Sequence, residues 1–240
     1  MRSTLIWLCL FCVSGLWAQR DEAYVKTEVE TFVSSLAERG IKKYFHTRRY
    51  CSGNIEMFII DGQNCMSKGT YYESYIFWAE GEQAYVKKID NCGLFLSVAL
   101  QDDAILKFAR EHVVGMEQEE VKPYKSETYT GTPEQRKPVQ PCFREYYFAT
   151  GNEAFSKQFN LFDISNDSDG KNLNYDHNQA LKLIKLNGLI DQLIMTEKKS
   201  FKRPGRAPIQ WSPSSIEDRQ TWARLASEED ISADTTARKG

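Results

Sequence analysis

The sequence predicts an α+β fold in which an antiparallel meander sheet packs against an N-terminal amphipathic helix, with further helices after the sheet and a flexible C-terminal tail. The hydrophobic period is helical in residues 22–39 and changes to a period of two in residues 43–100. All seven prolines lie at or after Pro123, so the region before it can form continuous regular structure, since proline interrupts helices and central strands. A helix, a meander and a second helix make one α+β layer.

The chain begins with a segment typical of export. Met1 and Arg2 form a short positive region, and residues 5–16 form an apolar run that ends at Trp17-Ala18. This run is too short for a membrane span and lacks its flanks, so we expect a signal peptide over residues 1–18 that is removed and leaves no transmembrane span. The protein would then be secreted or periplasmic. An uncleaved anchor is the alternative.

The net charge and the cysteine content narrow the possible classes of function and the cellular compartment. Removing residues 1–18 takes away only the charge of Arg2, so the net charge changes from −2 to about −3, and no basic stripe remains that could bind nucleic acid. Four cysteines survive processing: Cys51, Cys65, Cys92 and Cys142. In an oxidising compartment an even number favours disulfides, and three pairings stay open. Their isolated spacing argues against zinc, and free buried cysteines are the alternative.

In the first half of the domain, segments with a helical hydrophobic period flank segments with the period of two that is typical of strands. A helix is predicted over residues 22–39, with Gly40 as its stop signal. Strands are predicted at 43–50, 54–61, 71–79, 84–90 and 93–100, each bounded by turn residues. The turn 80–83 predicts a hairpin. In the last strand Leu94, Leu96, Val98 and Leu100 would share one face and pack on the first helix. A second helix follows at 101–112.

The second half is marked by proline. Residues 117–141 contain four prolines and predict a long exposed loop. Residues 142–149 predict one more strand that rejoins the first sheet, with a disulfide from Cys142 to tie the return, so we expect a single domain over 19–197. A wide apolar stripe predicts a helix over 178–195. Residues 198–240 are basic and polar, and predict a flexible tail.

One loop resembles the calcium-binding loop of an EF-hand. Counted from Ser165, Asp167 and Asp169 hold the third and fifth places, Gly170 the sixth and Asp176 the twelfth. Calcium prefers such oxygen ligands around a glycine turn. The pattern departs from the motif, because serine replaces the usual first aspartate and the twelfth residue is the shorter aspartate. A solvated loop with Asp176 capping the next helix is the alternative interpretation.

Aromatic residues are concentrated in one predicted hairpin, and Tyr75 and Trp78 lie in its first strand. An aromatic sheet face can bind a protein or carbohydrate partner. Core packing and cross-strand pairing are the alternative. The hairpin also carries Glu73, Glu80, Glu82 and Asp90. Paired carboxylates can hydrolyse a glycoside, whereas a charged strand edge would discourage aggregation.

Catalytic signals are scarce. The only histidines are His46, His112 and His177, and the odd separation of His46 from Cys51 would point the two side chains to opposite faces of one strand. The sequence contains no nucleophile elbow, zinc-binding histidine pair, P-loop or dinucleotide-binding glycine motif. We therefore expect an exported binding or interaction module rather than an enzyme, with no cofactor unless calcium binds. A hydrolase with dispersed catalytic residues and a structural protein with a calcium-stabilised loop are the alternatives.

Overall fold

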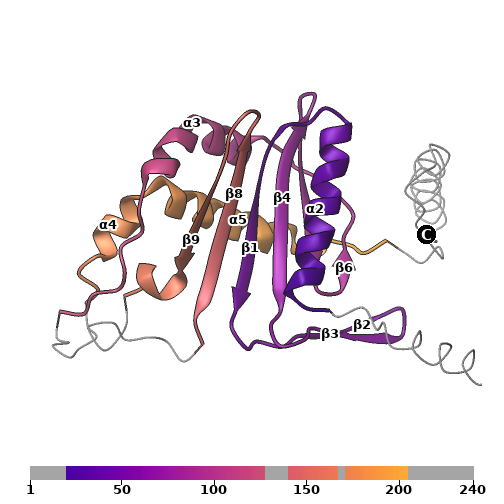
Figure 1. The fold of residues 1–240 in the computed structure, drawn as a ribbon, viewed down its shortest axis with the longest axis horizontal. Helices are drawn as coiled ribbons and strands as arrows, with labels where there is room; N and C mark the ends of the chain where they lie inside the picture. The colour runs from indigo at the N-terminus through magenta and orange to yellow at the C-terminus, as the bar shows by residue number, and fades with distance from the viewer. Residues whose placement is uncertain (1–19, 128–139, 167–170, 205–240) are drawn as a thin grey trace, which may run out of the picture. The chain divides into compact units, whose positions relative to one another are not determined.

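A computed structural model describes residues 20–127, 140–166 and 171–204. It shows the α+β class that the sequence predicts, with an N-terminal helix, an antiparallel sheet and later helices (Figure 1). The chain divides into two compact units, Met1–Pro204 and Gly205–Gly240, and every described residue belongs to the first. The predicted signal peptide lies outside the described residues, as does the predicted tail beyond residue 204. None of the described helices is long and apolar enough to cross a membrane.

The central element is a seven-stranded antiparallel sheet in the order β6-β5-β4-β1-β8-β9, with β7 also paired to β5. Its strands are β1 (Lys43–Cys51), β4 (Tyr72–Glu80), β5 (Gln83–Asp90), β6 (Gly93–Leu94), β7 (Val98–Ala99), β8 (Cys142–Thr150) and β9 (Ala154–Asn160). A separate hairpin consists of β2 (Met57–Ile60) and β3 (Gln63–Met66). The helices are α2 (Glu22–Glu38), α3 (Ala104–Gln118), α4 (Tyr175–Ala180) and α5 (Lys182–Thr196), with 3-10 turns at η1 (Leu161–Ile164) and η2 (Glu197–Lys199).

Helices pack on both faces of the sheet. Helix α2 lies on one face, and α3 and α5 lie on the other (Figure 1). Because side chains alternate along a strand, β4 contributes to both cores: Ile76 and Trp78 pack beneath α2, whereas Tyr75 and Phe77 pack towards α3 and α5. The predicted hairpin between β4 and β5 is confirmed, and Gly81 supplies the positive φ of 61° that its tight turn requires.

The chain returns to the first sheet after residue 140, as predicted. Strand β8 pairs with β1 along its whole length, so β1 becomes a central strand. Cys51 lies directly opposite Cys142 in this register, and the two form a disulfide. A second disulfide joins Cys65 in β3 to Cys92 in the turn after β5. The structure therefore selects one of the three pairings that the sequence allowed.

The prediction of one continuous strand over 93–100 is wrong. The segment forms β6 and β7, separated by a stretch in which the Leu96 amide donates to the Lys202 carbonyl (2.8 Å) and not to a neighbouring strand. Leu94 packs on the α2 side, whereas Val98 and Leu100 pack on the opposite side, and Leu96 is 42% exposed. Only the first of these four side chains therefore reaches the first helix.

Other boundaries also differ from the prediction. The helix expected over 101–112 begins later and extends to Gln118, and β3 and β9 were not predicted. The helix expected over 178–195 is divided at Leu181, whose backbone is extended (φ −63°, ψ 141°). Glu119 explains the break, because its two carboxylate oxygens accept hydrogen bonds from the amides of Lys182 and Leu183 (2.8 and 2.9 Å). A carboxylate from the end of α3 thus fixes the start of α5.

Candidate functional site: a groove beside helix α2

The face of the sheet that carries α2 is only half covered. Helix α2 packs over β4, β5 and β6, whereas β1, β8 and β9 have no helix on this face in the part of the chain that the structure describes (Figure 1). A groove of about 710 Å³ lies between the side of α2 and the uncovered strands. The groove is the candidate site, since binding sites are typically concave and of this size.

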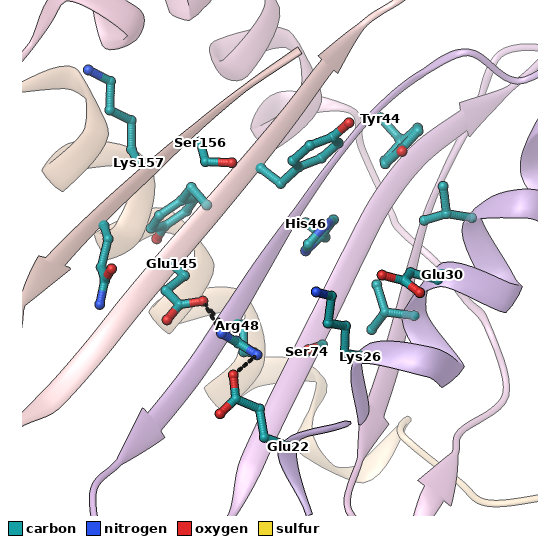
Figure 2. Close-up of a pocket in the computed structure, with 15 residues that line it drawn as sticks. Glu22, Lys26, Glu30, Tyr44, His46, Arg48, Ser74, Glu145, Ser156 and Lys157 are labelled. Atoms are coloured by element: carbon teal, nitrogen blue, oxygen red, sulfur yellow. Dashed lines mark hydrogen bonds and ion pairs between the residues drawn. The ribbon is translucent and has the colours of Figure 1, made fainter. Parts of the chain in front are cut away.

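One side of α2 forms the wall of the groove. Its lining residues are Glu22, Lys26, Val29, Glu30 and Val33, which recur at the three- and four-residue spacing that places side chains on one side of a helix. The N-terminus of the helix is fixed by Asp21, whose carboxylate accepts from the Tyr24 amide (3.1 Å). Figure 2 shows Lys26 and Glu30 on the α2 side of the groove and Ser156 and Lys157 on the β9 side.

One end of the floor is an ion cluster centred on Arg48. In the sheet register Arg48 lies opposite Glu145, and its guanidinium bonds to that carboxylate (2.5 Å) and to Glu22 on α2 (2.7 Å). The hydroxyl of Tyr50 donates to the other Glu145 oxygen (2.9 Å), and that of Tyr72 donates to the other Glu22 oxygen (3.2 Å). Burial alone would lower the pKa of Arg48, but Glu145 and Glu22 raise it above its ordinary value. The cluster ties α2 to β1 and β8.

The middle of the floor is aromatic. His46 lies opposite Tyr147 in the register and stacks on it, with ring centroids 5.2 Å apart. Tyr147 also stacks against Tyr44, at 6.1 Å. Ser156 on β9 lies opposite Tyr147 and is exposed. Residues opposite one another in antiparallel strands share a face, so three strands contribute to one continuous surface.

The aromatic floor is uncharged at neutral pH. Burial, with a smaller contribution from the nearby Arg48, lowers the pKa of His46 to about 4. Burial and the contact with Tyr147 raise the pKa of Tyr44 to about 12. The buried Nδ1 of His46 has no hydrogen-bond partner in the structure as described. A polar atom without a partner in a groove floor is unusual, because buried polar groups are nearly always hydrogen-bonded.

The residues singled out for binding in the sequence lie elsewhere. Tyr75 is 1% exposed and Trp78 is 2% exposed, so neither ring is available at the surface. Trp78 packs between Phe32 and Tyr85, and the Tyr75 hydroxyl donates to a carboxylate. The partly exposed rings of the sheet include Tyr44, His46 and Tyr147 in the groove floor, which sequence reasoning did not find.

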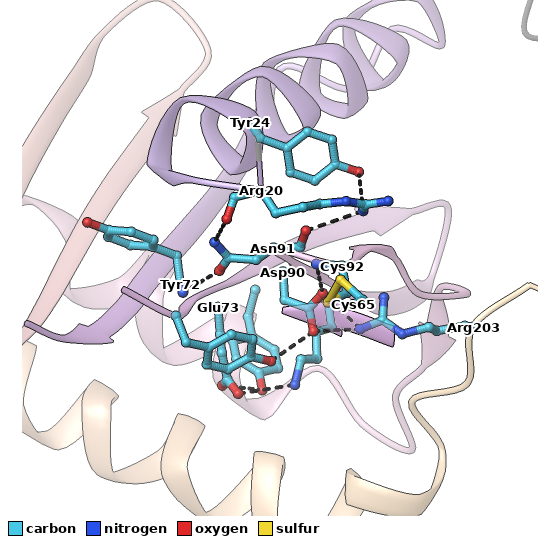
Figure 3. A network of polar contacts seen from close by, with 12 residues as sticks. Arg20, Tyr24, Cys65, Tyr72, Glu73, Asp90, Asn91, Cys92 and Arg203 are labelled. Atoms are coloured by element: carbon cyan, nitrogen blue, oxygen red, sulfur yellow. Dashed lines mark hydrogen bonds and ion pairs between the residues drawn. A yellow bond between two sulfur atoms is a disulfide. The ribbon is translucent and has the colours of Figure 1, made fainter. Parts of the chain in front are cut away.

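The carboxylates of the predicted hairpin are engaged in ion pairs. Glu73 pairs with Lys88 (3.2 Å), and Glu80 pairs with Arg39 (2.9 Å). Burial alone would raise the pKa of Glu73, but Lys88 holds it below its usual value. Asp90 is buried and receives two hydrogen bonds from Arg203 (2.8 and 2.7 Å), as Figure 3 shows. These contacts fit structural roles in the sheet and its edge.

The calcium-like loop is described only in part, because Asp167 and Asp169 lie outside the described residues. The Ser165 hydroxyl donates to the Phe162 carbonyl (2.9 Å). Asp176 is exposed in the first turn of α4, and the helix cap is Asn174, so the predicted capping role of Asp176 is wrong. Among the described residues, no group of three or more His, Cys, Asp or Glu side chains is arranged to hold a metal ion.

The flanks of this loop are fixed by a buried asparagine. The Asn172 amide nitrogen donates to the carbonyls of Asp163 (2.9 Å) and Ser165 (3.1 Å), and its oxygen accepts from the Lys125 amide (3.2 Å). Asn178 adds bonds to Asp163 and Lys122 (both 2.8 Å). Neutral amides thus organise the described part of this region.

Comparison of the chain with protein-family models, with curated proteins and with solved structures gives no match.

Proposed function

We propose that the protein is an exported, non-enzymatic binding module that holds a neutral, hydroxyl-rich ligand such as a carbohydrate in the groove beside α2. The observation that carries the proposal is the uncharged aromatic floor, in which the neutral imidazole of His46 stacks on Tyr147 and Tyr147 stacks on Tyr44. A neutral imidazole can donate or accept one further hydrogen bond, and a hydroxyl group can complete either arrangement. Neighbouring tyrosine rings supply the apolar contact that a sugar ring needs.

The charges of the groove support a neutral ligand. The lining contains the acidic residues Glu22, Glu30 and Glu145 and the basic residues Lys26 and Arg48, whereas the ammonium of Lys157 donates to the Glu119 carbonyl at the end of α3 (2.9 Å). No sign dominates, so the groove does not concentrate ions of either charge. Polar but uncharged side chains complete it, and Ser156 and Gln158 are both exposed on β9. A ligand rich in hydroxyl groups can use these side chains without bringing a counter-charge.

The ion cluster argues for binding over hydrolysis. Glu22 and Glu145 are a carboxylate pair, but all four of their oxygens accept bonds from Arg48, Tyr50 or Tyr72. A general acid or base needs a carboxyl that is free to exchange a proton with the substrate. His46 cannot replace it, since its pKa of about 4 is far below neutral pH and its Nδ1 contacts no orienting carboxylate among the described residues.

Export is supported by the cysteines. Two disulfides join all four cysteines of the described residues. Such crosslinks persist in oxidising compartments and are rare in reducing ones. We therefore infer a secreted or periplasmic location, in keeping with the signal peptide that the sequence predicts.

The test is a screen of neutral oligosaccharides with the protein processed after residue 18, followed by calorimetric titration of each ligand that binds. The variant His46→Phe keeps an aromatic ring against Tyr147 but removes both nitrogens, so we expect affinity to fall by about two- to tenfold, the value of one neutral hydrogen bond. Tyr147→Ser should weaken binding further, because it removes the stacking ring.

The matched control is His112→Phe, since this histidine also contacts an aromatic ring, edge to face with Phe108, but lies on α3 outside the groove. It should bind like the unaltered protein. Failure of every neutral saccharide to bind, or equal affinity of the His46→Phe and His112→Phe variants, would overturn the proposal. Circular dichroism of each variant separates lost binding from lost folding.

A second candidate function, self-association, is favoured by the hairpin β2-β3. Within the described residues its two strands pair only with each other, and Met57, Ile59 and Met66 are 63%, 76% and 58% exposed. Exposed apolar strands with open edges pair readily with another strand, and a second copy of the hairpin offers the same apolar face. Analytical ultracentrifugation should then show a dimer that Ile59→Lys dissociates. A monomer at high concentration would exclude this function.

A further inference from the structure

A second cavity lies at the end of the sheet where β1 begins and β8 ends. Its volume is about 730 Å³, and it opens between α3 and the strands β1, β4 and β8. It is bordered by the segment 39–41 after α2 and by the β4-β5 turn. Apart from Tyr44, which borders both spaces, its lining residues differ from those of the groove beside α2.

The walls of this cavity are apolar. Leu106, Ala109 and Val113 line it from α3, at the spacing that places three side chains on one side of a helix. Phe45 and Phe148 line it from the sheet, and their rings stack 5.6 Å apart. Both rings are 2% exposed, so they form the deep end, while Leu106 and Val113 are only partly buried. The cavity is thus continuous with the core between the sheet and α3.

The rim of the cavity is basic. Four cationic side chains line it, against one acidic side chain: Arg39, Lys42, Lys43 and Arg110 against Glu80. Arg39 pairs with Glu80 (2.9 Å), and Arg110 pairs with Asp103 (3.3 Å). Lys42 and Lys43 are exposed and have no ion-pair partner in the part of the chain that the structure describes. Two free ammonium groups therefore stand at the mouth of an apolar space.

We infer that this cavity binds a single-chain anionic amphiphile, such as a long-chain fatty acid. The acyl chain would lie between α3 and the sheet, against Leu106 and Val113, and the carboxylate would meet Lys42 and Lys43. A nucleotide or sugar phosphate fits less well, because the deep walls offer carbon and almost no hydrogen-bonding groups. A neutral apolar ligand would leave the basic rim unused. The inference does not depend on the carbohydrate proposal, because different residues carry it.

The first test varies the chain length of the ligand. Saturated fatty acids from octanoate to hexadecanoate are titrated into the processed full chain by calorimetry, below their micelle concentrations. Each methylene that enters the cavity should tighten binding about fourfold, and affinity should level off when the cavity is full. The absence of saturable one-to-one binding by any chain, or affinity independent of chain length, would overturn the inference.

The second test separates the rim from the walls. The double variant Lys42→Glu, Lys43→Glu should weaken dodecanoate binding at least about tenfold, while binding of its uncharged methyl ester changes by less than about twofold. The control is Lys107→Glu, Lys185→Glu, which reverses two exposed charges outside the cavity. Equal dodecanoate affinity of the two double variants would contradict the role of the rim.

The third test introduces a large side chain into the apolar wall of the cavity. Val113→Trp should weaken binding of both dodecanoate and its ester at least about tenfold, because the larger ring occupies the chain site. Val114→Trp is the matched control, since Val114 is adjacent, 65% exposed and outside the lining. Equal affinity of these two folded variants would overturn the inference. Sedimentation with phosphatidylglycerol vesicles shows whether the ligand is a free fatty acid or the acyl chain of a membrane lipid. If the ligand is a free fatty acid, the protein stays in solution. If it is a lipid acyl chain, the protein pellets with the vesicles, and Val113→Trp prevents this.

Discussion

Replacing His46 with phenylalanine should make the protein less sensitive to acid. The imidazole is largely buried against Tyr147, and its pKa falls from the ordinary 6.5 to about 4 in the folded state. Between these two values the unfolded chain binds a proton that the folded protein excludes. Stability from this group is therefore complete above about pH 6.5 and is lost as the pH falls towards 4. Phenylalanine keeps the ring but has nothing to protonate.

The size of the effect follows from the two pKa values. At about 1.4 kcal/mol per tenfold change in the equilibrium, His46 should cost about 2 kcal/mol of folding stability between pH 7 and pH 5, and about 3 kcal/mol by pH 4. For a chain of this size, 2 kcal/mol corresponds to a fall of roughly 4 to 8 °C in melting temperature. The stabilising contribution of Glu73 is also lost in acid, since its pKa is lowered in the folded state, but this loss is the same in both proteins.

The assay is urea unfolding of both proteins at a series of pH values between 7 and 4. The difference in unfolding free energy between His46→Phe and the unaltered protein should grow in favour of the variant as the pH falls. His112→Phe serves as the control and should follow the unaltered protein. Parallel curves for the unaltered protein and His46→Phe would refute the argument, because they would mean that the folded state accepts the proton on His46 without penalty.

Two further predictions concern stability. Replacing Cys51 and Cys142 with serine removes a crosslink that closes a loop of 91 residues, and should lower the free energy of unfolding by about 4 to 5 kcal/mol. Loss of the second disulfide should lower it by about 1 kcal/mol less, because that loop spans only 27 residues. Urea unfolding of the two double variants measures the difference. Asp90→Asn leaves the charge of Arg203 without its partner and should cost about 3 to 5 kcal/mol, with faster hydrogen exchange at Leu96, whose amide bonds to the same C-terminal segment.

The elements with strong local periodicity could be predicted from the sequence. The first helix was expected over 22–39 and spans Glu22–Glu38, and the β4-β5 hairpin was expected from its four-residue turn. Both elements are determined by residues close together in the sequence. The split of the final helix is not, since it arises from the carboxylate of Glu119, more than 60 residues earlier. No local pattern around Leu181 reports that contact.

The aromatic hairpin shows how a correct strand can suggest the wrong surface. In β4 the four residues from Tyr75 to Trp78 are all buried, because this half of the sheet has helices on both faces. An unbroken apolar run is typical of such a strand. In β1, by contrast, buried Phe45 and Thr47 alternate with partly exposed Tyr44, His46 and Arg48. In the sequence, the polar residues His46 and Arg48 at every second position were the available signal that β1, and not β4, has an accessible face.

The groove itself needed the register between strands that lie about 100 residues apart in sequence. His46 and Arg48 come from β1, and Tyr147 and Glu145 come from β8. A shift of one residue would turn every β8 side chain to the opposite face. Sequence spacing cannot fix a register across the intervening loop, so the contact of His46 with Tyr147 could be found only in the structure.

The disulfide between Cys51 and Cys142 makes the register of β1 and β8 depend on an oxidising compartment. It joins two residues that lie directly opposite one another, so it is compatible with the observed pairing of β1 with β8 and not with one shifted by a residue. In a shifted sheet Glu145 would leave Arg48, and Tyr146, whose hydroxyl now donates to buried Asn187 (2.9 Å), would face the groove. Oxidation therefore does more than stabilise the fold: it covalently selects the set of side chains that lines the groove, and an oxidising environment is part of how the proposed site is defined.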